Sequence, residues 1–260
     1  MSNSDVFRTL HSRVFVMPNA WDVGSARLLE SLGFAALATT SSGHAASLGR
    51  TDQSVHRDEL LRHVDSLAAA VSVPVSADSE GCFPDEPGGV ARTVELLGQA
   101  GAAGCSIEDF DPGVGLLPLD IAAGRVSEAA SAAAQHGLVL TARAENHLYG
   151  VTDLDDTIQR LLVYRAAGAD VVYAPGLSQL ADIRRVAGAV DAPLNVLAVP
   201  GIPPVAELGA AGVRRISTGG SLAWVAYGAL ASAGRELLTT GTTSYLEQAL
   251  TQADRGAAFG

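Results

Sequence analysis

The chain has 260 residues, of which 48% are hydrophobic, so it can fill the core of one large globular domain. Its formal net charge is −11 and it has no basic tract, so we expect neither nucleic acid nor an anionic membrane as a partner. All 17 basic residues are arginine, and the absence of lysine excludes Schiff-base catalysis and a phosphate-binding loop lysine.

Cysteine use and the N-terminal segment indicate a cytoplasmic protein. Cys82 and Cys105 are isolated thiols, with neither the spacing of metal ligands nor that of a disulfide framework. The segment 1–9 is polar, and no run of about 18 apolar residues occurs that could cross a membrane. We therefore expect no membrane span.

The chain alternates short apolar runs with helical periodicity. Eight runs predict strands: Val14–Met17, Ala35–Thr39, Val73–Ala77, Cys105–Glu108, Val139–Ala142, Val171–Tyr173, Leu194–Val196 and Arg215–Ser217. Helical spacing lies between them, over Ser25–Leu32, Arg57–Ala70, Val90–Ala100, Val126–His136, Leu154–Ala167, Leu180–Ala189 and Val205–Ala211, and a last helical region starts near Leu222.

Several helix-to-strand junctions repeat one pattern, an Ala-rich helix end followed by glycine, as at Gly168 and Gly212. Such spacing is typical of parallel strands joined by right-handed crossovers. Eight units predict a TIM-type (β/α)8 barrel as a single domain, 1–260, with a C-terminal helical extension from about 222. A doubly wound sheet is the alternative, but Pro18–Asp22 stands where its glycine fingerprint would follow the first strand.

Two acidic clusters follow neighbouring predicted strands. One contains Asp78 and Glu80, and the other is Glu108-Asp109. Since the carboxyl ends of barrel strands face one cavity, these carboxylates would repel one another unless protons or a divalent cation neutralise them. Oxygen ligands without a His or Cys pair favour Mg²⁺ or Mn²⁺ over Zn²⁺. The alternative is that they are ordinary solvated loop acids.

Other polar residues fall at the same end of the predicted barrel. Arg143 is the strongest anion receptor among them, because its planar fork matches a carboxylate or a phosphate. The others are Asn19, Asp22, Thr40, Ser41, Ser42, Gly43, Glu145, Asn146, His147, Asn195, Ser217, Gly219 and Gly220.

Some single residues have two interpretations. Cys82 could reach the cavity mouth, and Cys105 is expected to be core filler rather than a nucleophile. His147 and His44 could donate protons at the rim or point into solvent. We expect Arg214-Arg215 to be solvated or to face another subunit.

Taken together and in order, the motifs resemble those of the isocitrate lyase/phosphoenolpyruvate mutase superfamily, and the resemblance covers nearly the whole chain. The motifs are Pro18–Asp22, Ser47–Asp52, Asp78–Gly81, Glu108-Asp109, Thr141–Arg143 and Ser217–Ser221.

The resemblance implies a barrel whose last helices swap between subunits of a homodimer or homotetramer. It also implies Mg²⁺ and a small α-oxo acid substrate. By position, Asp78 would ligate the metal, and Glu80, Glu108 and Asp52 would hold its waters. Asp52, Glu108 and Arg143 would be the catalytic residues. Arg143 would clamp a substrate carboxylate. The remaining implied substrate-binding residues are Thr40, Ser41, Ser42 and Asn195.

One segment departs from the family pattern. The loop Phe110–Pro118 has no Cys, Lys, His or Asn, whereas superfamily lyases carry a catalytic Cys there and mutases a Lys and an Asn. Ala174-Pro175 also stands where lyases commonly place a Glu. We therefore predict a Mg²⁺-dependent lyase that makes or breaks a C–C bond, or decarboxylates, through an enolate. The alternatives are a P–C bond enzyme, a pyruvate-aldolase-like barrel and a non-catalytic oxo-acid-binding barrel.

Overall fold

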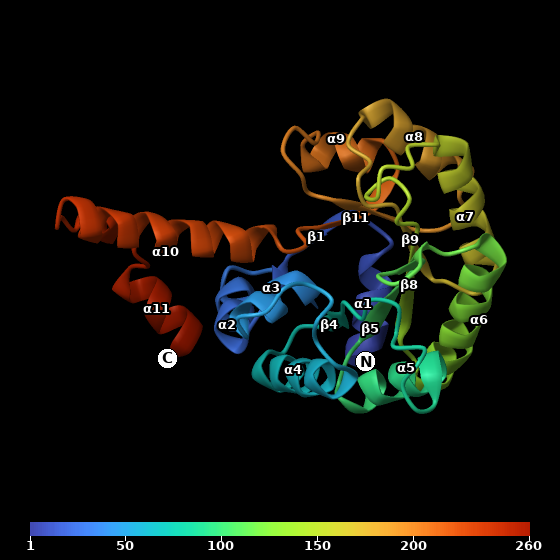
Figure 1. Ribbon diagram of the computed structural model, residues 1–260, viewed down its shortest axis with the longest axis horizontal. Helices are drawn as coiled ribbons and strands as arrows, with labels where there is room; N and C mark the ends of the chain where they lie inside the picture. Colours follow the sequence, from blue (N-terminus) through green and yellow to red (C-terminus); the bar gives the residue numbers. More distant parts are fainter.

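The computed structural model describes residues 1–260, and a nine-stranded parallel sheet rolled into a barrel lies at its centre (Figure 1). Strands β1 (Phe15–Met17) and β2 (Asn19–Ala20) stand at the two ends of the strand order, where β1 pairs with β11 and β2 pairs with β3. Only Pro18 separates them, and its carbonyl still accepts from Ala38 N at 2.9 Å. The two pieces act as one strand that closes an eight-stranded barrel, which confirms the predicted fold.

Every predicted strand segment overlaps a barrel strand. The other barrel strands are β3 (Leu37–Thr39), β4 (Val75–Ala77), β5 (Gly104–Glu108), β8 (Val139–Arg143), β9 (Val171–Tyr173), β10 (Leu194–Leu197) and β11 (Val213–Ser217). A small antiparallel hairpin, β6 (Phe110–Asp111) with β7 (Gly115–Leu116), follows β5 at the mouth of the barrel.

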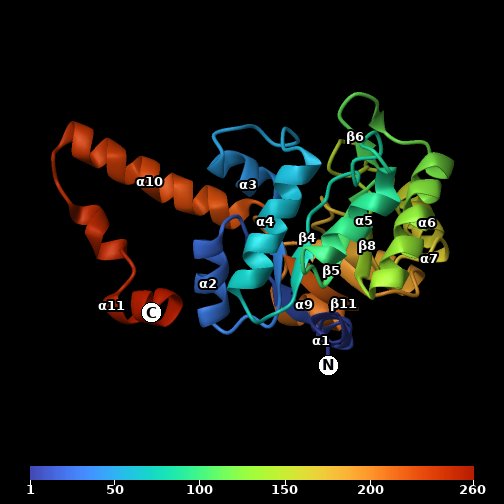
Figure 2. The same cartoon turned by 90° about the horizontal axis from the view of Figure 1, so that it is seen from below.

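Helices surround the barrel and follow its strands (Figures 1 and 2). They are α1 (Asn3–Leu10), α2 (Val23–Ser31), α3 (Ser41–Ser47), α4 (Arg57–Ala70), α5 (Gly89–Gln99), α6 (Leu119–His136), α7 (Leu154–Ala166), α8 (Leu180–Ala189), α9 (Val205–Ala210), α10 (Ser221–Thr239) and α11 (Gln252–Phe259), with a 3-10 turn η1 (Ser244–Gln248). The predicted bounds of α4 and α8 are confirmed. The prediction for α6 was wrong at its start, because the helix begins at Leu119, directly after Pro118.

Alternation along each strand separates the two faces of the barrel wall. Apolar side chains such as Ile107, Leu140 and Val196 point outward and join the main core beneath the helices. Their neighbours Ser106, Thr141 and Asn195 are buried polar residues that face inward. The inside of the barrel is therefore polar in its upper half, where the strands end.

The lower end of the barrel is closed by α1. Phe7 is fully buried there and packs among Met17, Ala38, Val139 and other small apolar side chains. Gly104 makes this possible, since an added Cβ would lie 2.8 Å from the Phe7 ring. The cavity of the barrel consequently opens only at the strands' carboxyl ends.

The last part of the chain leaves the barrel. Helix α10 projects away from it, and α11 returns to pack on α2 (Figures 1 and 2). Only Ala223 of α10 is buried, whereas Trp224, Val225 and Leu238 are exposed. None of the helices combines the length and apolar character needed to cross a bilayer. The helix swap and the homo-oligomer stay predictions.

Candidate active site

A cavity of about 190 Å³ opens at the carboxyl ends of the barrel strands. An adjoining cavity of about 340 Å³ shares Gln53 and Glu108 with it and reaches the β6–β7 hairpin. The first cavity brings together most of the residues predicted from the sequence. Its polar lining is Asn19, Thr40, Ser41, Ser42, Asp52, Gln53, Ser76, Asp78, Ser106, Glu108, Arg143, Glu145, Tyr149, Tyr173, Asn195, Arg215 and Ser217, together with two glycines, Gly219 and Gly220.

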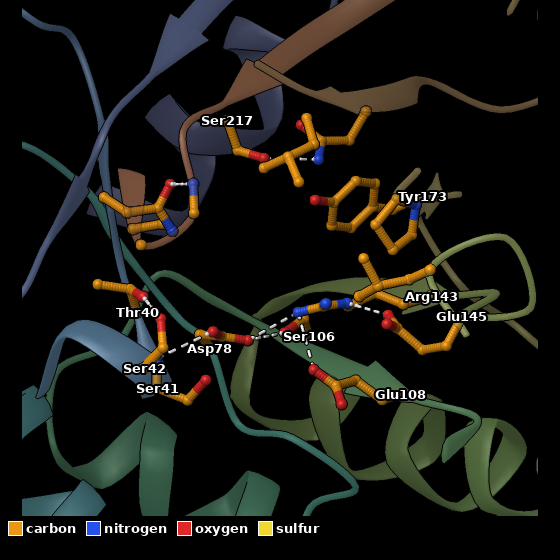
Figure 3. A pocket seen from close by; sticks show the side chains of 18 of the residues that line it. Thr40, Ser41, Ser42, Asp78, Ser106, Glu108, Arg143, Glu145, Tyr173 and Ser217 are labelled. Atoms are coloured by element: carbon orange, nitrogen blue, oxygen red, sulfur yellow. Dashed lines mark hydrogen bonds and ion pairs between the residues drawn. The ribbon is translucent and has the colours of Figure 1, made fainter. Parts of the chain in front are cut away.

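Arg143 lies at the centre of the site and contacts three carboxylates (Figure 3). Its Nη1 lies 2.9 Å from Asp78 Oδ1 and 2.9 Å from Glu108 Oε1, and its Nε donates to Glu145 Oε1 at 2.6 Å. Strand register produces this cluster, because Glu108 of β5 is paired with Arg143 of β8. The remaining guanidinium nitrogen, Nη2, makes no hydrogen bond to the protein and is free for a ligand.

Asp78 joins this cluster to the start of α3. Its Oδ2 accepts from Ser41 N at 3.1 Å, and its Oδ1 also accepts from Ser106 Oγ at 3.3 Å. The segment 40–43 is the capped start of α3, with Thr40 Oγ1 accepting from Gly43 N. This turn and that of α10 approach closely, since a Cβ on Gly220 would lie 2.4 Å from Ser42 Oγ.

The site has more carboxylates than cations. Burial and the neighbouring Asp78 and Asp52 raise the pKa of Glu80 to about 8. Burial also raises the pKa of Glu108 well above its usual range and, with Asp78 nearby, that of Asp52. Glu80 occupies a left-handed backbone conformation, φ +50°, which costs energy for a residue with a side chain. A cation that entered here would relieve this repulsion.

The donor set fits a magnesium ion. It consists only of oxygen ligands, which Mg²⁺ prefers. No group of three or more His, Cys, Asp or Glu encloses a metal position by itself. A magnesium ion in a protein usually keeps several waters and uses only one or two protein carboxylates together with the substrate.

Arg215 corrects one expectation, because it is neither solvated nor at a subunit surface. It is 3% exposed and points into the barrel from β11. Its Nε donates to Asn195 Oδ1 at 3.0 Å and its Nη2 to Thr141 Oγ1 at 3.0 Å, and no carboxylate contacts it. Burial therefore lowers its pKa to about 9. The alternation of side chains along β11 could have predicted this position, since Arg215 and Ser217 lie on the same, inward face of the strand.

The structure also places Asn195 in the cavity wall, but its amide is already engaged. Asn195 Nδ2 donates to Ser217 Oγ at 2.9 Å while its Oδ1 accepts from Arg215. Tyr173, which sequence reasoning treated only as part of a strand, lies beside this group, with the Arg143 guanidinium carbon 5.0 Å from its ring centroid. Tyr173 pairs in register with Asn195, a predicted site residue, and this pairing is the feature that could have indicated its place in the site.

Asp109 does not join the acidic cluster. It is 2% exposed and turns away from the cavity, where Tyr164 Oη donates to its Oδ2 at 2.5 Å and Arg160 Nη1 at 3.0 Å. The backbone N–H of Glu145 donates to its other oxygen at 2.8 Å. Asp109 thus stabilises the loop that carries Glu145. Its position beside Glu108 in the sequence had suggested membership of the acidic cluster instead of this structural role.

The thiols and the two candidate histidines lie outside the cavity. Cys82 is fully buried against Ser79, and burial raises its pKa to about 12, so the expectation that it could reach the mouth was wrong. Cys105 is buried in the core, as expected. His147 lies beside Gly176 of the next loop, and His44 stacks on His63 with ring centroids 3.7 Å apart.

Comparison with known proteins assigns this chain to a family. The model of the phosphoenolpyruvate phosphomutase family matches residues 7–238. A solved structure from Burkholderia cenocepacia J2315 is 45% identical, covers 98% of this chain and 94% of its own, and has a TM-score of 0.93. An oxaloacetate decarboxylase of Rhodopseudomonas palustris is 31% identical over 74% of this chain and 67% of its own. The structure of an oxaloacetate acetylhydrolase with its product oxalate is 25% identical, with a TM-score of 0.87 over 99% of this chain and 94% of its own.

Proposed function

Because the chain belongs to the isocitrate lyase/phosphoenolpyruvate mutase superfamily of enzymes, we propose that it is a Mg²⁺-dependent lyase. Its substrate would be a small α-oxo or hydroxy di-acid, and the reaction would cleave or form a C–C bond, or decarboxylate, through an enolate. The observation that carries this proposal is the gathering of Asp78, Glu108 and Glu145 on Arg143 beside the N-terminal turn of α3.

The size and polarity of the cavity favour a small acid. Its volume of about 190 Å³ lies below the roughly 300–1,000 Å³ of pockets that hold drug-sized ligands. Arg143 Nη2 and the hydroxyl groups of Ser41 and Ser42 offer donors to anionic oxygens on the two sides of Asp78. A substrate with a carboxylate next to a keto group could use both sets at once.

Asp78 would hold Mg²⁺ directly, and Glu80, Glu108 and Asp52 would hold its waters. When bound, the ion would supply Lewis-acid stabilisation of the negative charge that develops on the keto oxygen. Arg143 would fix the adjacent carboxylate, because its Nε and Nη1 are already locked by Glu145, Glu108 and Asp78. Such a locked donor costs no reorganisation during the reaction.

Oxaloacetate is the first substrate to test, since a decarboxylase and an acetylhydrolase that act on it are among the similar proteins. The purified protein with Mg²⁺ should release pyruvate and CO₂ from oxaloacetate, or cleave a related hydroxy di-acid, and EDTA should stop the release. Turnover of phosphonopyruvate in phosphorus NMR would instead assign P–C chemistry. Mg²⁺-dependent binding of oxo acids in thermal-shift assays, with no turnover of any di-acid, would instead support a non-catalytic oxo-acid-binding barrel.

A further inference from the structure

The proposed reaction needs a proton donor, and the cavity offers few. An enolate released by C–C cleavage must gain a proton at carbon before the oxo acid can leave. The thiols are buried elsewhere, and His147 and His44 lie outside the cavity lining. The loop Phe110–Pro118 contributes neither Cys, Lys nor His. Glu108 and Glu145 are held by Arg143, and the proposed function already assigns Asp52 and Glu80 to the waters of the metal ion.

Two tyrosines remain in the cavity wall. Tyr173 is only 6% exposed and lies in register with Asn195, beside the buried Asn195–Arg215 group. Tyr149 instead lies at the mouth, where it is 43% exposed. A proton lost from Tyr149 can therefore be replaced from solvent, whereas one lost from Tyr173 would leave an anion inside the barrel.

The ring of Tyr149 is held in a defined orientation. It stacks on Phe110, with ring centroids 3.5 Å apart and an angle of 3° between the planes. Tyr149 shares the lining of the first cavity with Gln53, which lines both cavities. Phe110 belongs to the β6–β7 hairpin, where it pairs with Leu116. The hairpin thus supplies neither Cys, Lys nor His but a platform for a tyrosine from the loop after β8.

The electrostatic surroundings keep this hydroxyl protonated. Burial and the nearby Glu108 and Glu145 raise the pKa of Tyr149 above its ordinary value of 10.0. At neutral pH the group is a hydrogen donor next to a cluster of carboxylates. The same negative field would draw a proton back to a tyrosinate after each turnover.

We propose that Tyr149 is the catalytic acid that protonates the carbon of the enolate. In this step the Tyr149 O–H bond breaks and a C–H bond forms from the electron pair of the enolate double bond, while the keto C=O bond is restored. The resulting tyrosinate takes a proton from water at the mouth. In the reverse direction, tyrosinate removes a proton from the carbon next to the keto group. The inference rests on the proposed function, because that function supplies the enolate.

The test uses exchange of the methyl protons of pyruvate for deuterium, followed by proton NMR in D₂O with Mg²⁺. Tyr149→Phe removes the hydroxyl and keeps the ring on Phe110. We expect exchange to slow by about 100-fold or more, the usual range for loss of a general acid–base group. Binding of oxalate with Mg²⁺, measured by calorimetry, should be unchanged. Tyr245→Phe, which removes a hydroxyl from η1 outside the cavity, should exchange like the wild type.

Four results would overturn the assignment. Exchange by Tyr149→Phe within about 10-fold of the wild type would show that another group moves the proton. Exchange and oxalate affinity lost in parallel would make the residue part of the binding surface. A wild-type protein that binds oxalate and cleaves a di-acid, yet exchanges no pyruvate protons, would exclude Tyr149 as the catalytic acid and leave the proposed lyase function standing. A wild-type protein that neither binds oxalate, cleaves a di-acid nor exchanges pyruvate protons would exclude both the role of Tyr149 and the proposed lyase function.

Discussion

Replacing Arg143 by methionine should destabilise the protein in a way that depends on pH. Arg143 is 13% exposed and holds Asp78, Glu108 and Glu145, which are 14%, 7% and 1% exposed. Removing one partner of a buried ion pair costs roughly 3–5 kcal/mol, because an unpaired charge stays buried. The three carboxylates share one cation, so we expect a loss of about 4 kcal/mol at alkaline pH without added metal.

The pH dependence follows from how Arg143 acts on its neighbours. Burial raises the pKa of Glu108 and Glu145, and the charge of Arg143 works against that rise. Without the arginine, both folded-state pKa values move further above the ordinary 4.5. An acid with a raised folded pKa loses stability as pH rises from its unfolded value towards its folded value. The variant should therefore lose stability with pH more steeply than the wild type, and the difference should shrink at about pH 5.

Urea denaturation with EDTA present, followed by circular dichroism at about pH 5 and about pH 8, measures this difference. Arg92→Met is the matched control. It removes an arginine that pairs with Glu95 on the surface of α5, where the side chains are 43% and 34% exposed, so the loss should stay below about 1 kcal/mol at both pH values. An equal loss for Arg143→Met at both pH values would refute the reasoning. It would mean that Arg143 stabilises the protein by packing on Tyr173 rather than through its charge.

Three further predictions concern single side chains. Glu80→Gln should stabilise the metal-free protein above about pH 8, because the variant no longer buries an ionised carboxylate. Below about pH 4.5 the wild-type carboxyl is protonated, so the stability should be unchanged. Denaturation measured across this pH range checks both expectations. Asp78→Asn should abolish Mg²⁺-dependent binding of oxalate in titration calorimetry, and unaltered affinity would contradict the metal assignment. Tyr164→Phe should lower the unfolding free energy by about 1.5–3 kcal/mol, since the buried carboxylate of Asp109 loses a donor, with oxalate binding retained.

The barrel could be predicted from local signals alone. Strand and helix periodicity alternate along the whole chain, and glycines such as Gly168 and Gly212, with φ of +110° and +102°, mark the reversals. The start of α3 could not be predicted in the same way, because Thr40-Ser41-Ser42 is polar and contains no apolar stripe. Its helix depends on the Thr40 cap and on Asp78, which lies far away in the sequence.

The candidate site was predictable where it followed strand ends and less so where it depended on side-chain direction. Asp78 directly follows β4, and Glu108 and Arg143 end β5 and β8, so topology alone brings them together. Asp109 is adjacent to Glu108, but the peptide between them turns its side chain to the opposite side, towards Arg160. Tyr149 lies on a loop, where neither alternation nor helical spacing indicates which way a ring points.

The seal that Phe7 forms at the bottom of the barrel bears on how the molecule handles its products. A fragment freed deep in the cavity has no rear exit and must pass the same aperture through which the substrate entered. Phe110 and Tyr149 flank that aperture. In the proposed cleavage, both fragments would therefore leave through this one opening.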